Sequence, residues 1–336
     1  MKMGKRNITG WIGLLWIIAV PGNAQQLPIY SQYTDNMFII NPAVAGNDAL
    51  TKINLTNRLQ WLGIKDAPRT SSFSMQGRLL KRKYRLANKL FSQGTTKEKY
   101  YIPKREGKVG MGGYVYNDRN GLIERSGFQY TYVYHIFLKG FNEISFGLSL
   151  TAFQFKLDRD HIAAKDPYDP VLYSQSSKTI FVPDANFGVF WLNRKFYAGF
   201  SALQLSQSLL KFGNNAFDDY QLYRHYYLIG GYYFELNPQY RIVPSILMRS
   251  TENLHTFQSD ISCRINYKNL LWGGLTYRTN HDIVFIIGGR YERFSITYAF
   301  DYPPNPIRQH SLGSHELTLA MIIGDTERRY RWLERY

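Results

Sequence analysis

The chain has 336 residues, with 41 lysines and arginines against 25 aspartates and glutamates, and it contains a single cysteine. One cysteine excludes a disulfide framework and a cysteine-based zinc module. The net charge of +16 and the hydrophobic content of 44% fit a folded chain, which excludes disorder as the overall state. The unusual feature is the aromatic content of 16%, led by 27 tyrosines.

Residues 1–24 have the features of a secretory signal peptide. Basic residues precede an apolar run over 11–20, and small residues follow at 22–24. The run is about half of the ~20 residues that a membrane-spanning helix needs. We therefore expect cleavage after Ala24 and a mature chain that leaves the cytoplasm.

Residues 25–50 follow the signal peptide and show little periodicity. The segment is rich in apolar and amide side chains, and its charged residues are Asp35 and Asp48. Asn41-Pro42 is a turn signal. If the strands that follow close into a barrel, we expect this segment to fold into the lumen as a plug, where strand glycines leave room. The candidate plug residues are Asn36, Asn41, Pro42 and Gly46.

From residue 51 onward, apolar residues alternate with small or polar ones at the period of two that is typical of β-strands. Along 127–137, for example, Phe128 and Tyr130 alternate with Gln129 and Thr131. About fourteen segments of this kind are predicted as strands. Their predicted spans are 51–60, 70–79, 108–117, 127–137, 143–155, 184–192, 195–203, 224–236, 240–249, 257–267, 270–277, 282–290, 292–300 and 314–323.

A soluble β-sandwich would share this alternation, but three features favour a membrane barrel. Aromatic residues gather near strand ends, as in the girdles of outer-membrane barrels. The other face carries Gly, Ser, Thr, Gln and Asn instead of the Lys and Glu of a water-exposed sheet. Short turns such as 139–140 alternate with longer connections at 156–183, 204–223 and 301–313, and the short turns of bacterial barrels face the periplasm. We predict an all-β, transmembrane outer-membrane β-barrel of about 14 antiparallel strands over residues 51–323, embedded in outer-membrane lipid.

One predicted connection breaks this alternation of lengths. Residues 80–107 should form a short periplasmic turn, yet 81–108 contains ten basic side chains against two glutamates. An ordinary solvated loop accounts for such a run as well as a docking element for an acidic periplasmic protein or for phosphates does. Nucleic acid is not expected, because a secreted chain does not meet it and no nucleic-acid-binding motif accompanies the run. The candidate docking residues are Lys81, Arg82, Lys83 and Arg85.

The sequence offers little catalytic chemistry. It has no Gly-x-Ser-x-Gly elbow, and its seven histidines do not have zinc-binding spacing. Carboxylate pairs at 166/169 and 218/219 are compatible with calcium, but they fit ordinary turns better. No catalytic, cofactor or metal residue is therefore expected.

Short motifs lie in a fixed order after the signal peptide. They are Ser31-Gln32-Tyr33 with Asn36, Asn41-Pro42-Ala43 with Ala45-Gly46, Arg58-x-Gln60-Trp61-x-Gly63 with Ala67-Pro68-x-Thr70, and Asn117-Asp118 with Gly121. In this order the set resembles the PorP/SprF family of type IX secretion system outer-membrane proteins. The similarity is densest over 25–150.

The resemblance implies a non-enzymatic barrel of the Bacteroidetes secretion and gliding machinery. Such proteins support export or surface attachment of cargo, often adhesins with a C-terminal sorting domain, and they associate with periplasmic components of the apparatus. At the predicted outer rim, Arg58, Gln60, Trp61 and Pro68 are candidate partner-binding residues, although rim packing explains them equally well.

Two other functions stay open from the sequence. A solute porin would have an open basic lumen that admits anions. A barrel hydrolase would bring loop carboxylates or histidines together. The charged tail 324–336 is expected to extend into the periplasm unless the last strand lies further along the chain.

Overall fold

The computed structural model describes residues 28–48, 50–79, 108–139, 141–157, 180–206, 209–210, 220–221, 223–252, 256–303 and 306–323. The predicted signal peptide, the basic segment 80–107 and the tail 324–336 lie outside the described residues. Within those ranges, no helix combines the length and the hydropathy needed to cross a membrane.

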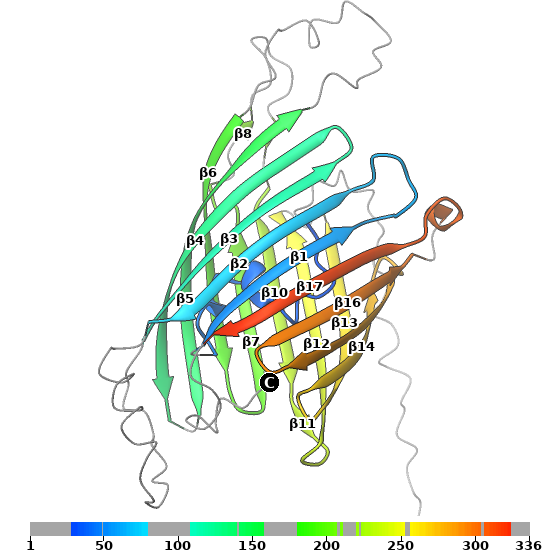
Figure 1. Ribbon diagram of the computed structural model, residues 1–336. Coiled ribbons are helices and arrows are strands. Elements are labelled where there is room, and N and C mark those ends of the chain that lie inside the picture. Colours follow the sequence, from blue (N-terminus) through cyan, green and yellow to red (C-terminus); the bar gives the residue numbers. More distant parts are fainter. Residues whose placement is uncertain are drawn as a thin grey trace, which may run out of the picture.

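Fourteen long strands among the described residues form one antiparallel sheet that closes on itself (Figure 1). They are β1 (Thr51–Leu59), β2 (Arg69–Arg78), β3 (Val109–Asn120), β4 (Ile123–Leu138), β5 (Asn142–Leu157), β6 (Ile180–Leu192), β7 (Phe196–Leu203), β10 (His225–Tyr232), β12 (Tyr240–Thr251), β13 (Phe257–Tyr267), β14 (Leu271–Arg278), β15 (Ile283–Tyr291), β16 (Phe294–Tyr302) and β17 (Ser314–Ile323). The first and last strands pair from Thr51↔Ile323 to Leu59↔His315, which closes the cylinder. The predicted barrel of 14 antiparallel strands is confirmed.

Three short elements complete the set of described strands. β11 (Phe234–Glu235) continues β10 past Tyr233 and pairs with β12. β8 (Leu209–Leu210) and β9 (Tyr220–Gln221) form a separate two-stranded ladder between β7 and β10. None of these elements changes the order of the fourteen wall strands.

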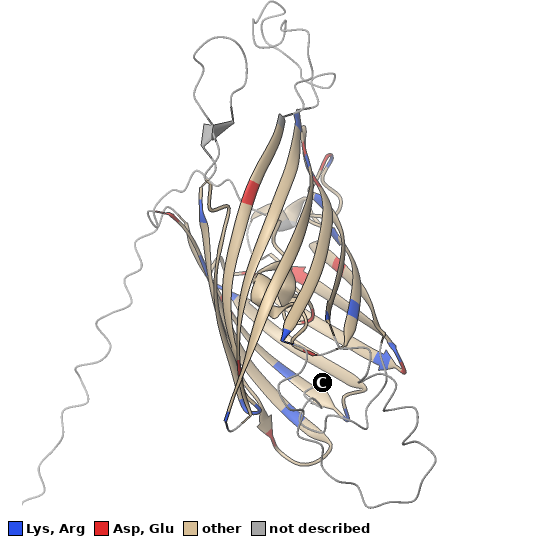
Figure 2. Cartoon of the chain, turned by 90° about the vertical axis from the view of Figure 1, so that its left-hand side faces the viewer, with Lys and Arg blue, Asp and Glu red and all other residues tan. Residues whose placement is uncertain are grey.

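The barrel wall is apolar outside and polar inside. On β4, Phe128 and Tyr130 are about half exposed (49% and 50%), whereas Gln129 and Thr131 between them are buried (7% and 0%). In Figure 2 the middle of the wall that faces the viewer is nearly free of charged residues. A closed sheet with this polarity satisfies its backbone hydrogen bonds internally and presents apolar side chains to lipid.

One side of the barrel stands higher than the other (Figure 1). β4 and β5 have 16 residues each, whereas β14, β15 and β16 have eight or nine. A strand of 16 residues extends about 54 Å, which is more than the ~25 Å apolar band requires even when the strand is tilted. The predicted span of β4 begins at 127, four residues after its observed start, and the charged residues Glu124 and Arg125 lie in that difference.

Residues 28–48 lie inside the cylinder (Figure 1). They contain two short 3-10 turns, η1 (Met37–Ile39) and η2 (Pro42–Val44). At η2 the Asn41 Oδ1 accepts the Ala43 N–H at 2.9 Å, and Pro42 occupies the first position, where its missing N–H costs nothing. A further turn, η5 (Pro306–Gln309), lies between β16 and β17.

Candidate functional site in the lumen

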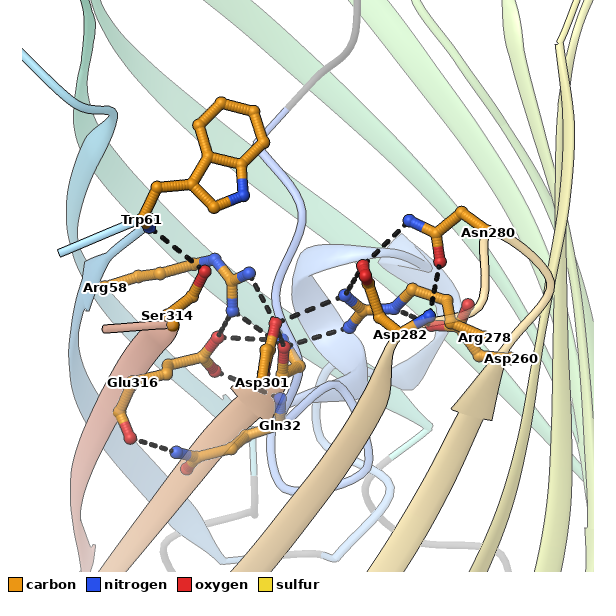
Figure 3. A network of polar contacts seen from close by, with 12 residues as sticks. Gln32, Arg58, Trp61, Asp260, Arg278, Asn280, Asp282, Asp301, Ser314 and Glu316 are labelled. Carbon is orange, nitrogen blue, oxygen red and sulfur yellow. Dashed lines mark hydrogen bonds and ion pairs between the residues drawn. The ribbon is translucent and has the colours of Figure 1, made fainter. Parts of the chain in front are cut away.

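A group of ion pairs lies inside the barrel where the first and last strands meet (Figure 3). Arg58 on β1 contacts Asp301 on β16 at 2.6 Å (Nη2 to Oδ2) and Glu316 on β17 at 3.0 Å (Nη1 to Oε2). All three side chains are at least 96% buried. Because β1 and β17 form the closing strand pair, these contacts hold the seam of the barrel from within.

The N-terminal segment is bonded to the same Glu316. The Ser31 N–H donates to Glu316 Oε2 at 2.7 Å, and the Gln32 N–H donates to Oε1 at 3.0 Å. The Gln32 side-chain amide also donates to the Glu316 carbonyl oxygen at 2.7 Å (Figure 3). We call residues 28–48 the lumen segment. Backbone N–H groups of this segment satisfy both oxygens of the buried Glu316 carboxylate, which fixes the segment against β17.

The Ser31 hydroxyl lies among three charged groups. It donates to Asp301 Oδ2 at 2.7 Å and accepts from Arg58 Nη1 at 2.7 Å and from Arg278 Nη2 at 2.9 Å. A hydroxyl has one donor and two acceptor positions, so its capacity is filled. Burial also raises the pKa of the neighbouring Tyr30, whose hydroxyl is 2.8 Å from that of Tyr114.

The ion pairs continue around the wall from Arg278 on β14. Its Nη1 is 3.2 Å from Asp301 Oδ2, and its Nε is 3.3 Å from Asp260 Oδ2 on β13. Asp260 also pairs with Arg249 on β12. In the turn after β14, partial burial raises the pKa of Asp282, which lies 3.8 Å from Arg278 Nη1.

We call these six charged residues the seam network, and their charges balance. Three guanidinium groups face three carboxylates, which offsets much of the cost of removing them from water. Such an arrangement has a structural role when every member has a partner. The members are Arg58, Arg249, Arg278, Asp260, Asp301 and Glu316.

A second group of polar and charged side chains holds the segment, near the end of the barrel that carries the short turns. Arg78 on β2 pairs with Glu143 on β5, and His135 Nδ1 on β4 is 2.9 Å from the same carboxylate. The His135 Nε2 is 3.1 Å from the carbonyl oxygen of Ala45. Since a carbonyl oxygen only accepts, Nε2 carries the proton and donates. The end of the lumen segment is therefore hydrogen-bonded to the wall as its beginning is.

Between these two ends, strand glycines let the segment approach the wall closely. A Cβ placed on Gly188 would be 2.2 Å from Asn41 Oδ1, and one on Gly147 would be 2.5 Å from the Ala43 nitrogen. A Cβ on Gly110 would be 2.2 Å from the Ala45 oxygen. Any larger residue at these three positions would occupy space that the segment now fills.

The four candidate plug residues all lie in the lumen. Asn36 Nδ2 donates to Ser74 Oγ at 2.8 Å, and Asn41 Nδ2 donates to the carbonyl oxygens of Val189 and Phe200 at 3.1 and 3.2 Å. Pro42 begins η2. Gly46 has a φ of +85°, a conformation that favours glycine, and an added Cβ would be 3.1 Å from the Gly110 Cα.

The candidate partner-binding residues occupy different places. Arg58 is 3% exposed and points into the lumen, so its side chain contacts the N-terminal segment and not the rim surface. Gln60 and Pro68 close the β1–β2 loop through a backbone hydrogen bond of 2.9 Å. The Trp61 N–H donates to Ser314 Oγ at 3.2 Å, which places Trp61 at the rim beside β17. Lys81, Arg82, Lys83 and Arg85 lie outside the described residues.

The other charged residues of the lumen were not predicted from the sequence. The available signal was their phase: a charged residue at an inward position of an otherwise apolar strand, such as Glu316 next to Leu317, must have a buried partner. Phase alone does not name that partner. In the described part of the chain, no three His, Cys, Asp or Glu side chains are grouped as a metal site would need.

A closed sheet with an apolar exterior, and a polar lumen occupied by the chain's own N-terminal segment, defines a membrane β-barrel with an internal segment. The family model described as type IX secretion system membrane protein PorP/SprF matches residues 22–321. The chain therefore belongs to the PorP/SprF family, which confirms the resemblance seen in the motifs. It is an outer-membrane barrel component of the type IX secretion system.

No curated protein matches the chain at a significant level. Among solved structures, the toluene transporter TbuX of Ralstonia pickettii has a TM-score of 0.45 and 7% identity, over 85% of this chain and 92% of that one. A Pseudomonas aeruginosa FadL homologue has a TM-score of 0.43 and 8% identity, over 90% and 95%. BamA from Haemophilus ducreyi, lacking POTRA domains 1–3, has a TM-score of 0.38 and 10% identity, over 81% and 70%.

Proposed function

We propose that this barrel is a non-enzymatic scaffold that supports export or surface attachment of adhesin-like cargo, and that segment 25–50 closes its lumen. The observation that carries the proposal is the attachment of the segment to opposite sides of the wall. Ser31 and Gln32 bind β16 and β17, whereas Asn41 binds β6 and β7. Attachment to opposite sides of the wall supports a rigid barrel with a closed lumen, which is what we propose for a scaffold that holds cargo.

A solute porin fits these contacts less well. An open channel needs a water-filled lumen, but Tyr33, Phe38 and Ala43 of the segment are at most 2% exposed within this one. The charged groups of the seam network bind one another and the segment, so they are not directed at a passing ion. Because the charged groups of the seam network already bind one another, they are also not arranged to hydrolyse a substrate.

The outer rim offers an apolar surface for cargo. Two backbone hydrogen bonds join the β1–β2 loop to the β16–β17 loop. The Leu62 N–H donates to the Gly313 carbonyl oxygen at 2.8 Å, and the Leu312 N–H donates to the Leu62 carbonyl oxygen at 2.7 Å. Leu62 and Leu312 are nonetheless 39% and 71% exposed. We call these two residues together with Trp61 the rim patch, and we propose that it contacts cargo, with Gln60 and Pro68 fixing the loop.

The basic segment 80–107 is proposed to meet periplasmic components of the apparatus. It connects β2 and β3 at the same end of the barrel as the short turns, the end that faces the periplasm in bacterial barrels. Ten basic residues over 81–108 would attract an acidic partner surface.

Affinity capture from detergent-solubilised outer membranes tests the proposal. The wild-type barrel should recover a large protein with a sorting domain together with periplasmic apparatus proteins. Trp61→Ala with Leu312→Ser should lose the cargo, while replacing Lys81, Arg82, Lys83 and Arg85 by glutamine should lose the periplasmic proteins. Recovery of neither class from wild type, together with high single-channel conductance, would favour a porin instead.

Conductance also tests the closed lumen separately. Deletion of residues 25–46 should raise single-channel conductance in planar bilayers, because the segment occupies the lumen between the wall strands. An unchanged conductance would count against closure by this segment.

A further inference from the structure

A cavity lies in the outer half of the lumen, above the N-terminal segment. The enclosed cavity space is about 70 Å³, and the ~620 Å³ between the lining residues includes open solvent at the mouth. Ile39 and Ile40 of the segment line it, as do Tyr116 on β3 and Phe153 on β5. The cavity therefore has a floor supplied by the lumen segment and walls supplied by the taller side of the barrel.

One wall of the cavity is aromatic. Tyr114 and Tyr116 project from alternate positions of β3 and stack with ring centroids 5.4 Å apart and an interplanar angle of 23°. Tyr30 lies beside them, hydrogen-bonded to Tyr114. Aromatic faces of this kind take the apolar face of a ring by stacking.

Two polar side chains at the cavity have no hydrogen-bond partner among the described residues. Gln204 and Tyr227 are each 8% exposed, and neither side chain has a hydrogen bond within the ranges that the structure describes. Their neighbours Gln129 and Asn186, by contrast, bond to each other at 3.0 Å. The polar atoms of Gln204 and Tyr227 are not enclosed, so a ligand that enters the cavity can pair with them.

The backbone conformation of Gln204 also indicates a binding site. Gln204 has a φ of +59°, a left-handed conformation that is costly for a residue with a side chain. The Gln204 N–H is held by the Asn186 side-chain oxygen at 3.0 Å. Strain of this kind persists where the surrounding structure fixes it, and it gathers at binding sites.

Among the residues that the structure describes, the lining of the cavity carries no charged side chain. It contains tyrosine, phenylalanine, aliphatic, threonine and amide groups, in contrast to the seam network on the opposite wall. A charged ligand would lose its hydration here without gaining a counter-charge. The described lining therefore favours an uncharged ligand.

We propose that this cavity binds a neutral saccharide ring. The C–H face of the ring would stack on the tyrosine wall, and ring hydroxyls would pair with the Gln204 amide and the Tyr227 hydroxyl. An apolar anchor side chain from a partner protein would fill the same space but leave both polar groups unpaired, which disfavours it. The proposal is independent of the scaffold role, since capture of cargo at the rim does not require it.

Calorimetry on the full-length barrel, in a detergent without a sugar headgroup, tests the proposal. The probes are the methyl glycosides of glucose, galactose, mannose and N-acetylglucosamine. At least one should bind to the wild type, and Tyr227→Phe and Gln204→Gly should each weaken it about tenfold, the loss expected for one hydrogen bond. Glycine suits the left-handed backbone at 204, so that variant should fold. Tyr130→Phe, on the lipid-facing side of β4, is the matched control and should bind as the wild type does.

Three outcomes would overturn the proposal: no glycoside binds at millimolar concentration, binding is unaffected by both variants, or N-acetyltyrosinamide binds in place of every sugar. The winning sugar is then tested free and attached to a carrier protein. Binding of either form supports the site. Equal affinity indicates a free sugar as the source, and preference for the conjugate indicates a glycan on a larger molecule.

Discussion

The guanidinium of Arg58 donates to the hydroxyl of Ser31 at 2.7 Å, joining the first barrel strand to the segment that precedes it. Arg58 also holds Asp301 on β16 and Glu316 on β17, so this one hydroxyl lies where the first and last strands meet. Closure of the cylinder and seating of the N-terminal segment therefore depend on the same buried charges.

Arg58→Met should destabilise the barrel by about 3–5 kcal/mol, because Asp301 and Glu316 would remain buried without their partner. The measurement is the temperature at which the folded, fast-migrating band is lost on electrophoresis without boiling. Arg69→Met is the control, since Arg69 is exposed at the start of β2. Equal melting of the two variants would show that the seam network adds no stability.

Ser31→Ala should lower the free energy of unfolding by about 1–3 kcal/mol, because Arg58 and Arg278 both lose a hydrogen-bond acceptor. This is the penalty for buried donors left without an acceptor. The matched control is Ser71→Ala. The Ser71 hydroxyl also accepts a hydrogen bond, at 2.8 Å from Asn57 Nδ2, but the contact is exposed on the outward face of the wall and no buried charge depends on it. A denaturant titration in lipid vesicles compares the two, and a larger loss at Ser71 would contradict the expected order.

Gly188→Ala should displace the lumen segment without breaking the wall. The added Cβ would lie 2.2 Å from Asn41 Oδ1 and 3.0 Å from Pro42 Cδ, both of which belong to the segment. Gly113→Ala is the control, because the nearest atom there is 3.9 Å away. Single-channel recording should show higher or unsteady conductance for the first variant only. Unchanged conductance in both variants would mean that the segment adjusts around the methyl group or does not close the lumen.

Trp61 has a φ of +52°, so its backbone is left-handed. Trp61→Gly should consequently be more stable than Trp61→Ala by about 1 kcal/mol, because glycine adopts this conformation without a steric cost. Thermal melting of the two purified variants gives the difference. Both should lose the same contact with cargo, so a capture experiment that separates them would contradict a role for the indole in the rim patch.

The strands could be predicted because the membrane imposes one rule on all of them. Every residue of a closed sheet faces either lipid or the lumen, so alternation persists through the whole wall. For β13 and β17 the predicted spans 257–267 and 314–323 are those of the structure. The prediction fell short on the taller side, at β4 and β6, where the strands continue beyond the apolar band and the pattern that marks them ends.

The sequence by itself determined the fold class, the family and the alternation of inward and outward positions along each strand, since these follow from local alternation and short motifs. Only the tertiary structure decided which of them meet. Ser31 and Glu316 are 285 positions apart in the chain, and they touch because the sheet closes on itself and brings its last strand against its first. Local periodicity carries no information on that distance, because partners across a lumen are set by the number and stagger of strands around the cylinder.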